Sequence, residues 1–126
     1  MFFSVDHALD LWAVGFLGTA LVIQGATPRW FAGTTGWSFA GPWQREIAIF
    51  DLTLGIIVIV VRRSGGALGH SLVWALILMS AMLGANHLEG VVRSGGRPGN
   101  WAGVGANAIA IAYALGALLW GMPAAS

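Results

Sequence analysis

Four long apolar stretches occupy most of this 126-residue chain, and they limit the folds that it can adopt. They span roughly residues 9–25, 44–61, 68–92 and 101–121, and each approaches or exceeds the length that a helix needs to cross the apolar part of a bilayer. Only 9% of the residues are charged, against about 25% in a soluble domain. The sequence therefore predicts an all-α integral membrane protein, with four transmembrane helices in a single domain over residues 1–126.

The connections between these stretches predict how the helices are arranged. Short turns that contain Arg-Ser-Gly-Gly follow the second and third stretches. Short connections make successive helices antiparallel, so we predict an antiparallel four-helix transmembrane bundle. The first connection, residues 26–43, is longer and rich in Trp, Phe and Gly. Because aromatic side chains favour the membrane–water boundary, this segment is predicted to be a loop or short helix in the headgroup region.

All seven tryptophans lie near the ends of the predicted helices, as the aromatic belts of membrane proteins require. In the antiparallel arrangement four of them share one membrane face, called here the Trp-rich face, and three share the opposite face. We predict that all of them are interfacial anchors: Trp30, Trp37, Trp43 and Trp101 on the Trp-rich face, and Trp12, Trp74 and Trp120 on the other.

The few charges predict an orientation and exclude some functions. Because cytoplasmic loops are enriched in Arg and Lys, the Trp-rich face is predicted to be cytoplasmic, with both termini outside. That face carries Arg29, Arg45, Arg93 and Arg97, whereas the other carries Arg62 and Arg63. A formal net charge of +1, with no run of basic residues, argues against nucleic-acid binding. The absence of Cys excludes disulfides and thiolate chemistry.

Polar residues interrupt the apolar stretches at one depth. Counted from the predicted helix ends, Asp51, Asn86, His87 and Asn107 all lie about 8–10 Å below the Trp-rich face. Closer to that face lie the carboxylates and guanidinium groups that could pair with one another: Glu46 and Glu89 with Arg45 and Arg93. Charge at such depth is costly in lipid, so these side chains should face protein or water.

Two interpretations of this polar layer stay open. The side chains could simply join helices by hydrogen bonds, with Arg45–Glu46 and Glu89–Arg93 as ion pairs. Alternatively, they could line a pocket open to the Trp-rich face, in which Glu46 or Asp51 with His87 binds a small ligand or relays a proton. Neither a nucleophile motif nor a metal-ligand spacing is present, so we expect no metal site and favour binding over catalysis, with no cofactor identified.

One segment resembles a known family. Arg45-Glu46, the apolar run that follows, and Leu54-Gly55 ahead of a β-branched stretch are similar to the second helix of DoxX-like proteins and related small four-helix bacterial membrane families. The resemblance implies a four-helix fold in a bacterial cytoplasmic membrane and places Glu46 at the position of the families' glutamate. It also implies a link to quinone or redox systems, although the absence of Cys departs from any thiol role.

Three functions are therefore predicted as alternatives. The first is binding of a small ligand or a quinone-like or redox partner in the polar layer. The second is an accessory subunit that packs through Gly- and Ala-rich helices into a larger membrane complex. The third is a homo-oligomeric transporter or channel in which Asp51 lines the path.

Overall fold

A computed structural model describes residues 4–64 and 66–120, and within these ranges the chain is helical with no strand. The first helix, α1 (Val5–Gly18), continues directly into a π-helix, η1 (Thr19–Ala26). A short helix, α2 (Pro28–Thr35), follows, and then three long ones: α3 (Gly41–Ser64), α4 (Gly66–Ser94) and α5 (Pro98–Trp120). The all-helical class is thus as the sequence predicts.

Capping chemistry explains why the helices begin earlier than the apolar stretches. The Ser4 hydroxyl accepts a hydrogen bond from the backbone N–H of His7 at 3.1 Å, which starts α1 at Val5 rather than near residue 9. The Gln44 side chain accepts from the N–H of Ala40 at 3.0 Å at the start of α3. Proline suits a first helical position, and Pro98 opens α5. Gly121, at the predicted end of the fourth helix, lies outside the described residues.

Three helices are long and apolar enough to cross a membrane: Val5–Ala26, which combines α1 with η1, and then α4 and α5. Their surfaces fit a bilayer, since large apolar side chains such as Leu78, Met82 and Ile109 are exposed midway along them. The long helix α3 is not among these candidate spans, because it carries too many charges. Every 18-residue stretch of α3 includes at least three of its five charged residues, which are Arg45, Glu46, Asp51, Arg62 and Arg63. The structure therefore supports three candidate spans.

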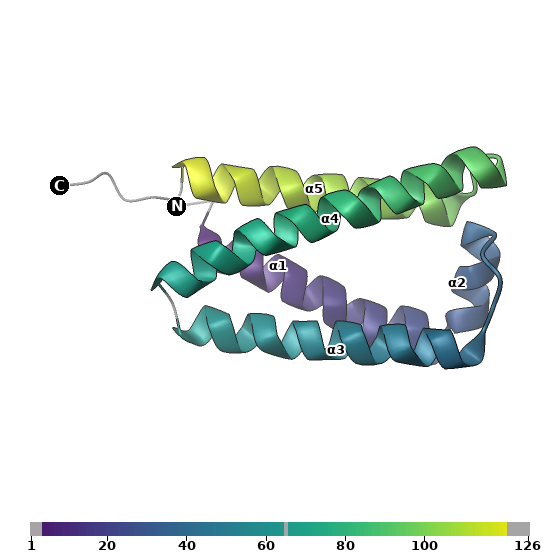
Figure 1. Ribbon diagram of the computed structural model, residues 1–126, viewed down its shortest axis with the longest axis horizontal. Coiled ribbons are helices and arrows are strands. Elements are labelled where there is room, and N and C mark those ends of the chain that lie inside the picture. Colours follow the sequence, from purple (N-terminus) through teal and green to yellow (C-terminus); the bar gives the residue numbers. More distant parts are fainter. Residues whose placement is uncertain (1–3, 65, 121–126) are drawn as a thin grey trace.

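The long helices pack as two pairs, α1–η1 with α3 and α4 with α5 (Figure 1). In Figure 1, α1 and α4 run from left to right, and α3 and α5 run back. The left-hand end, where α1 begins and α5 ends, is called here the terminal end. Across the right-hand end stands α2, and this end is called the α2 end. Trp30, Trp37, Trp43 and Trp101 all belong to segments at the α2 end, which is therefore the predicted Trp-rich face.

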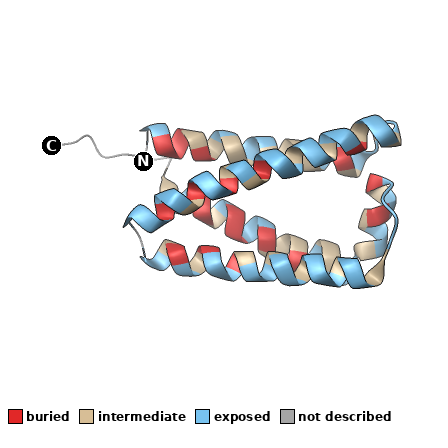
Figure 2. Cartoon of the chain, viewed as in Figure 1, coloured by how far each residue is buried: buried red, intermediate tan, exposed pale blue. Residues whose placement is uncertain are grey.

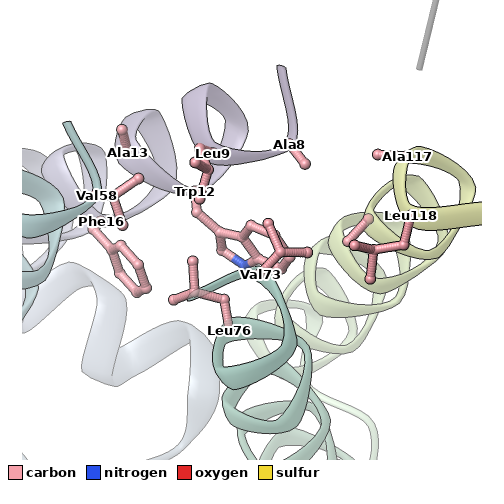
Figure 3. Close-up of a cluster of buried hydrophobic side chains, with 11 residues drawn as sticks. Ala8, Leu9, Trp12, Ala13, Phe16, Val58, Val73, Leu76, Ala117 and Leu118 are labelled. Carbon is pink, nitrogen blue, oxygen red and sulfur yellow. The ribbon is translucent and has the colours of Figure 1, made fainter. Parts of the chain in front are cut away.

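An apolar core fills the terminal half of the molecule. Side chains of α1, α3, α4 and α5 meet there around the indole of Trp12, with Leu9, Val73 and Leu76 close by (Figure 3). The Trp12 Nε1–H donates to the buried hydroxyl of Ser80 at 3.0 Å. Trp12 is only 5% exposed, so it packs between helices, whereas Trp74 is open to the surroundings. Buried residues are scarcer towards the α2 end (Figure 2), and polar contacts dominate the packing there.

Candidate functional site

One buried side chain, Asn100 near the start of α5, joins three helices at the α2 end. It is 0% exposed. Its Nδ2 donates to the carbonyl oxygen of Thr35 at the end of α2 (2.9 Å) and to the hydroxyl of Ser94 at the end of α4 (3.1 Å). The Ser94 hydroxyl in turn donates to the carbonyl oxygen of Gly90 at 2.6 Å. Asn100 therefore ties α2 and α4 to α5.

The imidazole of His87 on α4 is held in place from three sides. Its Nδ1 lies 3.4 Å from Oδ1 of Asn100. On one side the indole of Trp37 stacks on the ring, with centroids 5.1 Å apart and planes inclined by 22°. Gly103 of α5 also approaches the ring, so closely that a Cβ at residue 103 would overlap it. The ring is thus fixed between an aromatic side chain and a bare helix backbone.

Two polar–glycine pairs interlock α4 and α5 at this point. Asn100 occupies the space that a side chain at Gly90 would need, since its Oδ1 lies 2.7 Å from the position of such a Cβ. His87 does the same to Gly103. In each helix the polar residue and the glycine are three positions apart, so they share a face. Each helix therefore supplies one polar side chain and one gap that receives the other's side chain.

The short helix α2 is attached to the same region by a second contact with the α4–α5 connection. Arg97 donates from Nη1 to the carbonyl oxygen of Gly33 at 2.9 Å. The chain leaves α2 through Gly36, whose φ of +74° favours glycine, and the Arg97 side chain packs where a Cβ at residue 36 would stand. Trp37 follows and meets Phe31 edge-on, with ring centroids 6.1 Å apart. These contacts place Trp37 over His87.

A pocket of about 310 Å³ lies between the end of α2 and the last turns of α4. An aromatic wall, polar groups and two opposite charges surround it. Its lining consists of Thr35, Gly36, Trp37, Asn86, Glu89, Gly90, Arg93 and Ser94. Glu89 and Arg93 form an ion pair at 2.6 Å, and both side chains are largely exposed. The pocket can therefore offer a bound molecule a ring surface as well as hydrogen-bond donors and acceptors.

The structure divides the predicted polar layer. Asn86, His87, Glu89 and Arg93 gather around the pocket or its wall. Asn107 instead donates to the carbonyl oxygen of Gly103 in its own helix, at 2.8 Å. In the described part of the chain, no hydrogen bond or ion pair joins Asp51 or Glu46 to this group, and Glu46 is exposed. The ion pairs of the described residues are Glu89–Arg93 and Asp10–Arg62, so Arg45 and Glu46 are not paired within residues 4–64 and 66–120.

Two shielded oxygens lie elsewhere, on the α1–η1 and α3 pair. Neither Oε1 of Gln24 nor Oδ2 of Asp51 has a hydrogen-bond partner in the described part of the chain. Gln24 belongs to the π-helix η1, which packs along α3. There the backbone leaves no room for a side chain at Gly25, where a Cβ would stand 2.8 Å from the carbonyl oxygen of Ala20. π-Helical turns occur frequently at functional sites.

Asn100, Thr35, Ser94 and the stacking of Trp37 on His87 were not predicted from the sequence. Asn100 follows a Gly-rich basic turn, and asparagine is common in turns and caps, so its position gives no sign of burial. A usable signal is the matched spacing of His87 with Gly90 and of Asn100 with Gly103 in adjacent predicted helices. Small residues mark places where membrane helices approach closely, and a polar residue three positions away faces the same neighbour.

Comparison with known proteins adds no relative, because no protein-family model, curated protein or solved structure matches the chain. The class is therefore defined by the structure itself: an all-helical protein with three helices able to span a membrane, which indicates an integral membrane protein. Within residues 4–64 and 66–120, no three His, Asp or Glu side chains come together as metal ligands would.

Proposed function

We propose that the protein is a four-helix membrane protein that binds a small amphiphile with a quinone-like ring at the α2 end. The observation that carries the proposal is the pocket between α2 and α4, whose lining combines Trp37 with the polar residues Asn86, Glu89 and Arg93. Its volume of about 310 Å³ is at the lower limit of ligand pockets, about 300–1,000 Å³, which suits a single substituted ring.

The surroundings of the pocket support a ligand that arrives from the bilayer. Trp30, Trp43 and Trp101 at the same end are 67%, 66% and 53% exposed, as side chains at the headgroup level would be. An amphiphile can then keep its apolar tail among lipids while its ring reaches the pocket. A wholly water-soluble ligand would gain nothing from these exposed indoles.

We also propose that α3 is a fourth transmembrane helix, antiparallel to its neighbours. Between Ile47 and Val61 the only charged residue of α3 is Asp51, and one of its oxygens is shielded within the chain. Arg45 and Glu46 lie at one end of this span, and Arg62 and Arg63 at the other, where charges can reach water. Membership of a DoxX-like family, a bacterial cytoplasmic membrane and a cytoplasmic Trp-rich face stay predictions from the sequence.

Ligand titration in lipid nanodiscs tests the proposal. The probes are an alkylated benzoquinone and its reduced form, and the readout is tryptophan fluorescence. We expect at least one form to give a saturable decrease on top of the linear quenching caused by partitioning into lipid. Trp37→Phe should remove the saturable part, whereas Trp74→Phe, which changes an exposed tryptophan in the terminal half, should retain it. Linear quenching alone, or saturation that survives Trp37→Phe, would contradict the proposal.

The accessory subunit and the homo-oligomeric transporter stay predictions from the sequence. A path between protomers through Asp51 needs that side chain at an interface between copies, yet Asp51 is half-buried and one of its oxygens is shielded within a single chain. Native mass spectrometry from mild detergent tests these alternatives by mass: a homo-oligomer or a complex with other subunits would be heavier than the single chain expected of a solitary binding protein.

A further inference from the structure

The short helix α2 has a buried side and an exposed side. Its buried residues are Ala32 and Thr35. Arg29, Trp30 and Gly33 are exposed, and their positions fall within about 100° of one another around the helix, away from the buried side. These three residues are called here the outer face of α2. The helix therefore presents one arginine and one tryptophan to its surroundings.

A second arginine contacts α2 at its outer face. Arg97, from the connection between α4 and α5, donates from Nη1 to the carbonyl oxygen of Gly33, which is one helical turn beyond Arg29. A Cβ at Gly33 would meet no atom within 4 Å, so the surface around this residue is open. The helix α2 thus carries its own guanidinium group in its first turn and receives another near its end.

Both guanidinium groups keep free N–H donors. A guanidinium has five N–H groups. Within the described ranges, the Arg97 side chain makes a single hydrogen bond, the one to Gly33, and the Arg29 side chain makes none. The guanidinium carbon of Arg29 lies 5.1 Å from the centre of the Phe39 ring, a contact that needs no hydrogen bond. Both arginines can therefore still bind an acceptor from outside the chain.

Positive charge is concentrated at the α2 end. Among the described residues, neither Arg29 nor Arg97 forms an ion pair. Four arginines and two glutamates give the α2 end a formal side-chain charge of +2, whereas two arginines and two aspartates give the terminal end a charge of zero. The groups are Arg29, Arg45, Arg93, Arg97, Glu46 and Glu89 at the α2 end, and Arg62, Arg63, Asp6 and Asp10 at the terminal end.

We propose that the outer face of α2, together with Arg97, binds anionic phospholipids through their phosphate groups. Because α2 stands across the ends of the long helices (Figure 1), this face is at the membrane boundary when those helices cross the bilayer. Trp30, which is 67% exposed, favours the same level. A guanidinium group can donate two parallel hydrogen bonds to phosphate oxygens. A zwitterionic lipid adds a cation to this positive region, so an anionic headgroup is preferred.

A matched lipid pair tests the preference on the full chain in a mild nonionic detergent at low salt. The probes are phosphatidylglycerol and phosphatidylcholine with identical acyl chains, and native mass spectrometry measures the dissociation constant of the first bound lipid. One arginine near an anionic headgroup corresponds to about fivefold tighter binding, so two predict about 25-fold tighter binding of phosphatidylglycerol. Equal binding of the two lipids would overturn the proposal.

Three variants locate the preference on the molecule. Arg29→Gln should lower the ratio about fivefold, and so should Arg97→Gln. Because Arg29 makes no hydrogen bond within the described residues, its replacement tests the proposal even if Arg97→Gln loosens α2. Arg63→Gln is the control, since it removes the same charge from an exposed side chain at the terminal end. If Arg63→Gln lowers the ratio as much as Arg29→Gln, net charge explains the preference and the proposal is wrong.

Inorganic phosphate distinguishes a lipid site from a site for free phosphate. At the same concentration as the lipid it should not displace phosphatidylglycerol, because it has no acyl chains to lie beside the exposed Trp30. Displacement would overturn the assignment to lipid. Neither Arg29, Trp30 nor Arg97 lines the pocket between α2 and α4, so failure of the quinone titration leaves this proposal standing, and the reverse also holds.

Discussion

Replacing Asn100 by alanine should destabilise the protein far more than the same change at Asn107 on the same helix. Asn100→Ala removes contacts with Thr35, Ser94 and His87. Thr35 is 0% exposed, so its carbonyl oxygen would be left buried without that donor. Leaving such a group unpaired costs about 1–3 kcal/mol, and each of the other two interhelical contacts is worth about 0.6 kcal/mol in a membrane protein. The expected loss in the free energy of unfolding is therefore about 2–4 kcal/mol.

Asn107 is a close control, because among the described residues its side chain donates only to the carbonyl oxygen of Gly103 in its own helix. Asn107→Ala should cost less than about 0.6 kcal/mol, since no interhelical hydrogen bond is lost and alanine favours the helix. The assay is unfolding in mixed micelles by increasing the mole fraction of sodium dodecyl sulfate, followed by circular dichroism. If both variants unfold at the same mole fraction, Asn100 does not hold the α2 end together and the reasoning is wrong.

Three further predictions concern other contacts. Gly103→Ala should lower the free energy of unfolding by about 1–3 kcal/mol and weaken ligand binding, because the new methyl group overlaps the His87 ring. Gly105→Ala is the control: nothing lies within 4 Å of its new methyl group, so it should be nearly neutral in the same unfolding assay. Trp12→Phe should lower the free energy of unfolding by about 0.6–1.7 kcal/mol, because the hydrogen bond to Ser80 is lost. Trp74→Phe changes an exposed side chain and should leave the unfolding midpoint unchanged. Equal unfolding midpoints of the two variants would refute this prediction. The Asp10–Arg62 ion pair is about half exposed, so a double-mutant cycle with Asp10→Asn and Arg62→Gln should give a coupling below about 1 kcal/mol, and a larger value would show that it is shielded.

The helices could be predicted because their signals are local. Apolar length identifies each long segment, and Pro98 and the Gly pair at residues 95 and 96 mark where α5 begins and where the chain turns, with φ values of +70° and +86° at the two glycines. The first connection contains a short helix, α2, which is one of the two forms predicted for it, while its position in the headgroup region stays a prediction. The end of the first helix was not predictable in detail, because nothing local in Thr19–Ala26 separates a π-helix from an α-helix.

The site could be predicted only in part, because depth along a helix does not say which neighbour a side chain faces. Counting residues placed Asp51, His87 and Asn107 at one level, but the structure directs His87 to Asn100 and Asn107 to its own helix. Which pair forms depends on the rotation of each helix about its axis. That rotation follows from packing between distant segments, here the fit of His87 against Gly103.

The attachment of α2 to α5 also sets a time order on the biogenesis of the protein. Thr35 and Asn100 are 65 positions apart, and Gly33 and Arg97 are 64 apart. At a synthesis rate of about 5–20 residues per second, α2 waits about 3–13 s for its anchor to be translated. During that interval the carbonyl oxygens of Gly33 and Thr35 at the end of α2 lack their donors Arg97 and Asn100. Ribosome-bound chains that stop before residue 97 should therefore insert their first helices while α2 still lacks its attachment to α5.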